Sequence, residues 1–423
     1  MEIVKLKDEI GIKERIKEAN TSALERMRLS RPILIDIKCA KDILPQMKKN
    51  SIFHAGHPID WERMCGPLRG AIVGTMIFEG LATTWNDAVK LIRQGGVEFS
   101  SNHDHEAVGP MAGVISPSLP ILVVKDQSNG KICFARFVEN RVQFGQFDKE
   151  SVDVLRFWSE RISQLLGKAI RKSKGIDLKP IMAKALHMGD ELHNRPAAGT
   201  LLFETIILPH LLGVCSPNDV REVTKYLSEN DIFFLCISMA ACKAITKAAH
   251  GIKYSTLVTV MARNGTNFGI KVSGLGNDWF VGKANMIEGL YFPGYGPEDA
   301  NPDIGDSAIT ETAGIGAFAL AGSPAILALI GGTAEDAIRY TYEMRKITNS
   351  LNDTFTLPII NFQGTATGID IRKVLRTGIT PVIDTAMAHK QAGGGYIGAG
   401  LVKAPLEPFK NALHAYGRRY KLV

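Results

Sequence analysis

The stretch STLVTVMARNGTNFGIKVSG, residues 255–274, gives the clearest indication of the fold class. Two runs of alternating residues flank Asn264–Gly265, and this dipeptide between such runs is the strongest short-range signal for a β-hairpin. The hairpin follows a long region of helical pattern, residues 151–250. Strands therefore return after a helical segment, and the chain is predicted to mix α and β structure.

The regions before the hairpin support the same interpretation. Residues 151–173, SVDVLRFWSERISQLLGKAIRKS, repeat apolar residues with a period near 3.6, which is typical of an amphipathic helix. Strands are expected at RPILIDI (31–37), LPILVVKD (119–126), KICFARFVE (131–139) and RVQFGQF (141–147). We predict an α/β fold of mixed α+β character, made of an N-terminal α/β domain (1–150), a helical domain (151–250) and a glycine-rich C-terminal α/β domain (251–423).

Composition excludes several classes of protein. Of the 423 residues, 45% are hydrophobic and 22% are charged, which is ordinary for a globular chain. No segment approaches the about 20 uninterrupted apolar residues of a membrane helix, and the charged N-terminus lacks a signal-peptide core. The six cysteines show no C-x-x-C spacing, which favours a reducing compartment. We expect a cytoplasmic protein with no membrane partner.

The net charge of +7 suits small anionic substrates. The basic residues are scattered and are not interleaved with aromatic residues, so no nucleic-acid partner is expected.

The stretch HAGHPIDWERMCGPLRG, residues 54–70, is a candidate substrate site. Pro58 favours extended backbone before it, so a loop is expected. His54 is a candidate acid, and the guanidinium groups of Arg63 and Arg69 suit a carboxylate or phosphate. The alternative is a helix start that carries only surface charges.

Residues 100–116, SSNHDHEAVGPMAGVIS, form a second candidate. In an extended chain His103 and His105 would project to one face, with Asp104 and Glu106 on the other. Two histidines at this spacing can share a metal, and the same groups can serve as an acid or base. We name His103, His105 and Glu106 as catalytic candidates, against the alternative of a polar loop.

An acidic region without basic residues forms the third candidate. From Ala284 to Ile338 the chain has eight acids and no lysine or arginine. Uncompensated carboxylates repel one another, so a cation or an arginine from another segment should lie nearby. We name Asp299, Asp303 and Asp306 as candidate metal ligands and Asp303 also as a catalytic candidate. A solvated acidic loop is the alternative.

Further anion-binding candidates come from three other motifs. The motif HMGDELHNR ends in Arg195, MARNG contains Arg263 and Asn264, and PVIDTAMAHKQAGGG contains His389 and Lys390. Arg263, Arg195 and Lys390 are the expected counter-charges for the acidic region. We expect residues 54–69, 103–106 and 299–311 to line one cleft, because ligand sites favour domain junctions.

Several long motifs together resemble the AllG/YlbE-like family. They are HAGHPIDWERMCGPLRGA, HEAVGPMAGVIS, HMGDELHNR, MARNGTNFGIKVSGLG, YFPGYGPEDANPDIGDSAITETAG and GIDIRKV followed by PVIDTAMAHK. The resemblance implies two α/β domains and a helical domain. It also implies a subunit of oxamate carbamoyltransferase, which converts oxalurate and phosphate to oxamate and carbamoyl phosphate in allantoin degradation, beside FdrA-like and other subunits. The family pattern has proline in place of His57, so no role is implied for that residue.

Two alternatives to a carbamoyltransferase subunit stay open from the sequence. The histidine pairs and the acidic region would also fit a metal-dependent hydrolase that acts alone, and the chain could be a non-catalytic scaffold for FdrA-like proteins. The S-T-R-T and H-P-x-Q motifs of aspartate and ornithine carbamoyltransferases are absent. No cofactor is indicated apart from a divalent metal, which the sequence leaves undecided, and a homo-oligomer is expected.

Overall fold

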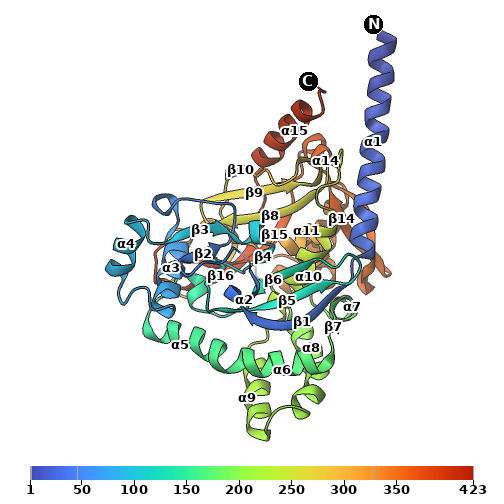
Figure 1. Ribbon diagram of the computed structural model, residues 1–423. Coiled ribbons are helices and arrows are strands. Elements are labelled where there is room, and N and C mark those ends of the chain that lie inside the picture. The colour runs from blue at the N-terminus through green and yellow to red at the C-terminus, as the bar shows by residue number, and fades with distance from the viewer. Residues whose placement is uncertain (1, 45, 329, 423) are drawn as a thin grey trace.

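The predicted hairpin forms the middle of a four-stranded antiparallel sheet (Figure 1). The computed structural model describes residues 2–44, 46–328 and 330–422, with side chains from residue 11 onward. Gly265 at the turn has a φ of +81°, which glycine adopts at little cost. The sheet order is β10-β9-β8-β12. Its strands are β8 (Val258–Asn264), β9 (Asn267–Val272), β10 (Phe280–Lys283) and β12 (Ile304–Gly305).

A second, five-stranded sheet comes mainly from the N-terminal third and has the order β4-β6-β5-β1-β7. Helices α6 and α10 pack against it, and β5 is buried along almost its whole length. A separate parallel pair, β2 with β3, lies beside it in the same region. The strands of this third are β1 (Pro32–Cys39), β2 (Ser51–His54), β3 (Glu98–Ser101), β4 (Ala107–Val108), β5 (Pro120–Asp126) and β6 (Ile132–Arg136). Its helices and short turns are α1 (Glu2–Leu29), α2 (Ala40–Ile43), η1 (Trp61–Arg63), α3 (Gly66–Phe78), α4 (Trp85–Arg93), η2 (Asn102–His105) and η3 (Val142–Phe144).

The middle of the chain is helical, as predicted, apart from the short strand β7 that joins the five-stranded sheet. Helix α10 is its central element, because almost every residue of α10 is buried and it contacts both sheets. The elements of this region are α5 (Lys149–Phe157), the π-helical turn η4 (Trp158–Ile162), α6 (Ser163–Ser173), β7 (Ile176–Asp177), α7 (Leu178–His187), α8 (Ala197–Leu212), α9 (Pro217–Ser228) and α10 (Phe234–Ala248).

The C-terminal region adds two small antiparallel sheets, β11-β16-β15 and β13-β14. The strands are β11 (Glu288–Tyr291), β13 (Thr348–Leu357), β14 (Gln363–Ile369), β15 (Val382–Ala388) and β16 (Tyr396–Lys403). The helices and short turns are η5 (Ser273–Leu275), α11 (Ile309–Ala313), η6 (Gly316–Gly322), α12 (Ala325–Ala328), α13 (Ala334–Arg345), η7 (Pro358–Ile360), α14 (Ile371–Thr377) and α15 (Glu407–Arg419).

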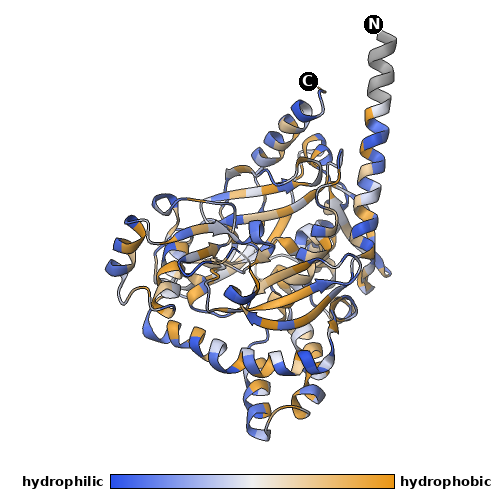
Figure 2. Ribbon diagram, viewed as in Figure 1, coloured by the Kyte–Doolittle hydropathy of each residue, from blue (hydrophilic) through white to orange (hydrophobic). Residues whose placement is uncertain are grey.

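These elements confirm the mixed α/β fold class. Figure 2 shows largely hydrophobic strands in the interior and outer helices, such as α5 and α9, that alternate between hydrophilic and hydrophobic residues. The C-terminal half of helix α1 packs against α10 and β13, and only the other end of the helix extends away from the rest of the chain (Figure 1). Within the described parts of the chain, no helix has the length and apolar character needed to cross a membrane. The division into three domains stays a prediction.

Two local predictions were wrong. The stretch RVQFGQF (141–147) is a 3-10 turn, η3, rather than a strand, and it ends at Gly145 in the left-handed region with a φ of +88°. His103 and His105 lie in the 3-10 turn η2 rather than in extended chain. The side-chain alternation of a strand therefore does not apply to them, and the two rings have different surroundings.

A buried ion pair fixes β12 against β8. Arg263 Nε and Nη2 donate hydrogen bonds of 2.7 and 2.9 Å to the two oxygens of Asp303, and Arg263 Nη1 donates to the carbonyl of Gly305 at 2.7 Å. Both side chains are buried. This bidentate geometry satisfies the carboxylate fully. The prediction that an aspartate of the acidic region pairs with Arg263 is confirmed.

We expect Arg263→Ala to lower the free energy of unfolding by about 3–5 kcal/mol, because it leaves Asp303 buried without its cation. Urea-induced unfolding of the two proteins measures the difference. Arg93→Ala is the matched control, since Arg93 and Glu62 form a pair with both side chains 65% exposed, and such pairs contribute about 0–1 kcal/mol. Equal losses for both variants would contradict this role for the buried pair.

Candidate functional site

A small polar cavity of about 260 Å³ lies where η2, α10 and the β8–β10 strands meet. Its most notable feature is three lysines, and we call it the lysine pocket. Lys243 and Lys247 are one turn apart on α10, and Lys271 comes from β9. The residues that line the pocket are His103, Asp104, Glu106, Lys243, Lys247, His250, Thr259, Val260, Lys271, Asn277 and Trp279.

Two carboxylates partly balance the three ammonium groups. Glu106 Oε2 lies 3.3 Å from Lys243 Nζ, and Lys247 donates a hydrogen bond to the other oxygen. Lys271 Nζ lies 2.5 Å from Asp104 Oδ1. Burial alone would raise the pKa of Glu106, but the charges of Lys243 and Lys247 outweigh burial and lower it to about 2. The pocket therefore has three lysines against two carboxylates, and such an excess of basic side chains attracts an anion.

His103 forms the inner wall of the pocket. Its Nδ1 lies 3.3 Å from Lys243 Nζ, and its Nε2 lies 3.4 Å from Asp306 Oδ1. Burial, together with the nearby charges of Lys243 and Lys271, holds the pKa of His103 well below its usual value. The ring is therefore neutral. Because an ammonium group can only donate, Nδ1 carries the lone pair and the ring proton is on Nε2, facing Asp306.

Asp306 joins three separate segments behind His103. Its carboxylate accepts hydrogen bonds from the backbone N–H of Gly56 at 2.8 Å, from Gly109 at 3.0 Å and from the side chain of Asn102 at 2.9 Å. Gly56 has a φ of +83°, and a Cβ there would lie 2.6 Å from Asn264. Burial raises the pKa of Asp306 to about 7, although these hydrogen bonds favour the ionised form.

The three segments predicted to share a cleft therefore do meet, but they do not line one cleft together. Residues 54–69 and 299–311 contact the back of the segment 103–106 through Asp306. Only residues 103–106 face the lysine pocket. The pocket is completed by residues of α10, β8 and β9, which no predicted chemical motif had indicated.

The other predicted histidines lie outside the lysine pocket. His54 is fully buried, with Nδ1 2.8 Å from the carbonyl of Ala55, and burial lowers its pKa to about 4. His105 stacks on Phe53 with ring centroids 3.8 Å apart. His57 packs near Trp279, a pocket residue, at a centroid distance of 6.3 Å.

The predicted anion-binding residues do not line this pocket either. Arg69 donates to the carbonyls of Trp61 and Glu62, and Arg195 donates to that of Gly189. Lys390 donates to the carbonyl of Glu298. Arg63 is exposed, and His389 Nε2 lies 3.9 Å from Asp299 Oδ1. The Asn264 side chain accepts from two backbone N–H groups of its own turn, at Thr266 and Asn267.

The three predicted metal-ligating aspartates are not brought together. Asp303 is held by Arg263, Asp306 accepts amide hydrogen bonds, and Asp299 accepts from the N–H of Gly296 at 3.1 Å within its own turn. Among the described residues, a different set of three has ligand atoms that all lie within 4.8 Å of one another: His193, Glu311 and Asp384.

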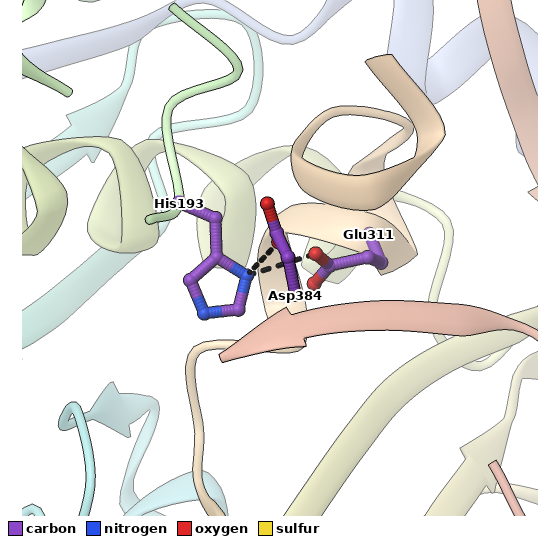
Figure 3. A group of neighbouring side chains, drawn as sticks. All are labelled: His193, Glu311 and Asp384. Atoms are coloured by element: carbon purple, nitrogen blue, oxygen red, sulfur yellow. Dashed lines mark hydrogen bonds and ion pairs between the residues drawn. The ribbon is translucent and has the colours of Figure 1, made fainter. Parts of the chain in front are cut away.

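This second cluster is buried and comes from three distant segments (Figure 3). His193 lies in the loop after α7, Glu311 on α11 and Asp384 on β15. His193 Nδ1 is 2.8 Å from Glu311 Oε1 and 3.0 Å from Asp384 Oδ1. Burial alone would lower the pKa of His193, but the two carboxylates outweigh burial and raise it to about 10.

Sequence reasoning missed His193 and the three lysines. A usable signal was present for two of them, because Lys243 and Lys247 are the only charged residues in the otherwise apolar α10 segment FLCISMAACKAITKA. A lysine that a helix buries needs an anionic partner or a function. His193 had no such signal, since its partners are 118 and 191 positions away.

Comparisons with known proteins give consistent matches over nearly the whole chain. A family model described as oxamate carbamoyltransferase subunit AllG matches residues 97–307. Uncharacterized protein YahG of Escherichia coli K12 is 44% identical over 99% of this chain and 90% of its own length. Oxamate carbamoyltransferase subunit AllG of the same organism is 39% identical, covering 95% of this chain and 97% of its own.

One solved structure also matches closely. It is described as a conserved protein of unknown function from Enterococcus faecalis V583, with 44% sequence identity and a TM-score of 0.93. The match covers 96% of this chain and 98% of that one.

The raised pKa of Asp306 predicts a pH-dependent contribution to stability. A carboxyl group with a folded pKa near 7 keeps its proton when the unfolded chain has already lost it. The contribution of Asp306 is thus fully present below about pH 4 and is lost as the pH rises to about 7. In Asp306→Asn this titration is absent. Relative to the native protein, the variant should gain about 2–3 kcal/mol in unfolding free energy between pH 5 and pH 8.

Chemical denaturation at several pH values measures this gain. The control is Asp60→Asn, which removes an exposed carboxyl group. A pH-independent difference for Asp306→Asn would show that Asp306 is ionised throughout this range.

Proposed function

Because the chain belongs to the AllG family, we propose that it is a subunit of an oxamate carbamoyltransferase and binds small anionic substrates in the lysine pocket. In the proposed reaction, oxalurate and phosphate give oxamate and carbamoyl phosphate, within allantoin degradation. The observation that supports a substrate site is the meeting of Lys243, Lys247 and Lys271 at one small cavity with only two carboxylates to balance them.

The charges of the substrates explain why such a pocket is needed. A phosphate oxygen attacks the ureido carbonyl carbon of oxalurate, a C–O bond forms, and the C–N bond to the oxamate nitrogen breaks. Oxalurate and hydrogen phosphate together carry three negative charges, and so do the products. Lys243 and Lys271 are both buried, so their attraction for anions is screened less than at an open surface. Fixed positive charge of this kind stabilises charge that develops in the transition state.

The same reaction requires the transfer of one proton. The proton of hydrogen phosphate must reach the departing oxamate nitrogen, because an amide anion is a poor leaving group. In the proposed mechanism His103 is the group that carries it, since its Nδ1 lone pair faces the pocket beside Lys243. Asp306 then acts as the positioning residue that keeps the ring proton on Nε2.

Partners form part of the same proposal. FdrA-like and other carbamoyltransferase subunits would supply the remaining substrate contacts, and the chain would associate with copies of itself. The chain is 44% identical to uncharacterized YahG and 39% identical to AllG. The assay should therefore compare oxalurate with other N-carbamoyl acids.

We expect Lys243→Gln and Lys271→Gln to weaken substrate binding. Loss of one charge-assisted hydrogen bond costs about 1.5–3 kcal/mol, or roughly tenfold to a hundredfold in affinity. Calorimetric titration of the isolated chain with oxalurate and with phosphate measures the dissociation constant. Phosphate-dependent consumption of oxalurate by the reconstituted complex measures KM. Lys149→Gln is the control, because Lys149 is 89% exposed on α5.

The outcomes separate the three functions. A tenfold or larger rise in KM for the two pocket variants alone supports the carbamoyltransferase subunit. Full complex activity in both pocket variants would favour the non-catalytic scaffold. Loss of oxalurate without phosphate, by this chain alone and with no carbamoyl phosphate formed, would favour a hydrolase.

A further inference from the structure

The buried cluster of His193, Glu311 and Asp384 has more acceptor groups than donors. The Nδ1 atom of His193 carries at most one proton, yet two carboxylate oxygens lie 2.8 and 3.0 Å from it. The hydrogen bond goes to Glu311. Both oxygens of Asp384 are buried and accept no hydrogen bond from an N–H or hydroxyl group, and their other neighbours are the carboxyl groups of Glu191 and Glu311. Burying a carboxylate without a hydrogen-bond donor or a cation costs free energy. We therefore expect a group that satisfies Asp384.

A third carboxyl group, that of Glu191, adds to the excess of acceptor groups over donors. Glu191 is fully buried and accepts from the backbone N–H of His193 at 2.7 Å. Across the described chain, no lysine or arginine side chain lies within 4.0 Å of the carboxylate oxygens of Glu191, Glu311 or Asp384, and His193 is the one basic side chain at that distance. Positive charge is therefore missing at the point where carboxyl groups from three distant segments meet.

We propose that His193, Glu311 and Asp384 bind one divalent cation, Mn²⁺ or Zn²⁺, through Nδ1 of the imidazole and one oxygen from each carboxylate. The three side chains point toward one another from a loop, a helix and a strand (Figure 3). A cation in place of the Nδ1 proton would contact both carboxylates at once, which a single proton cannot do. Imidazole with carboxylates is a ligand set that suits Zn²⁺ and Mn²⁺.

The distances between the ligand atoms agree with this assignment. Metal–ligand bonds of about 2.1 Å place neighbouring ligand atoms about 3.0 Å apart in octahedral geometry and about 3.4 Å apart in the tetrahedral geometry of Zn²⁺. The two measured separations, 2.8 and 3.0 Å, are close to the octahedral value. The arrangement therefore needs little adjustment to hold an ion.

A separate cavity of about 240 Å³ borders the cluster at His193, while Glu311 and Asp384 do not line it, so an open coordination position of the proposed site would face the cavity from the side of His193. His193 itself lines this cavity, together with Asn194, Ser307 and Thr385. The Nδ2 atom of Asn194 is buried and has no partner. Three protein ligands with an open position are typical of a catalytic rather than a structural metal site. This assignment does not depend on the proposed substrate, since it uses none of the lysine-pocket residues.

Metal analysis of the native chain tests the proposal directly. The full chain is expressed in medium that contains manganese and zinc, purified without chelators or metal-affinity resin, and measured by inductively coupled plasma mass spectrometry. We expect about one equivalent of Mn²⁺ or Zn²⁺ per chain, as for a buried site with three protein ligands. Chelation should lower the temperature of thermal unfolding, and re-addition of the same cation should restore it.

Variants then locate the ion. Asp384→Asn should reduce the bound metal at least about tenfold, whereas the matched variant Asp299→Asn should retain it. After chelation, Asp384→Asn should unfold at a higher temperature than the native chain, because it removes one of the two buried carboxylates that share the single Nδ1 proton of His193. Circular dichroism shows whether each variant is folded.

Two results would overturn the proposal. The first is a native chain that carries no Mn²⁺ or Zn²⁺ as purified and shows neither binding nor a change in unfolding temperature when titrated with either ion. The second is metal retained in full by a folded Asp384→Asn variant. In either case the cluster would be held together by shared protons instead of a cation.

Discussion

Three buried carboxylates within nine residues, Asp303, Asp306 and Glu311, are the constraint on which the rest of the structure depends. A buried carboxylate must be given donors or a cation, and here each receives them from a different part of the chain. Asp303 is held by Arg263 of β8, Asp306 by the N–H groups and side chain of the N-terminal region, and Glu311 by His193. This short stretch therefore fastens all three regions of the chain together.

The same stretch lies between the two sites. Asp306 faces the back of His103 at the lysine pocket, and Glu311, five positions later, faces His193 in the second cluster. The two sites contain side chains of opposite charge, since lysines line the first and carboxyl groups form the second. Their attachment to one short segment, from β12 to α11, holds the two sites close together. That arrangement is suited to a protein that binds an anion in one place and a cation in another.

Similarity to known proteins identifies the family of this chain, whereas the charges and contacts of its buried side chains indicate where ligands could bind. Relatives with 39% and 44% identity span nearly the whole chain, and a solved structure with a TM-score of 0.93 shares its fold. Membership of the family connects the chain to carbamoyl transfer, but it does not say which residues bind or react. The lysines around Lys243 and the buried oxygens of Asp384 are the observations on which the two proposed sites rest.

The sequence by itself determined the features that depend on neighbouring residues. Asn264–Gly265 specified the hairpin, and the region without lysine or arginine implied a distant cation for its aspartates, which for Asp303 is Arg263. Such features follow from local backbone preferences and charge balance, and both can be counted along the chain.

Only the tertiary structure decided how the sites are composed. Lys243 and Lys271 lie on a helix and a strand, and His193 meets Asp384 across 191 positions. His103 and His105 were expected to share a face, but the turn η2 buries one against Lys243 and stacks the other on Phe53. These contacts are set by how the apolar faces of α10 and the two sheets pack together, and no local spacing in the sequence encodes that packing.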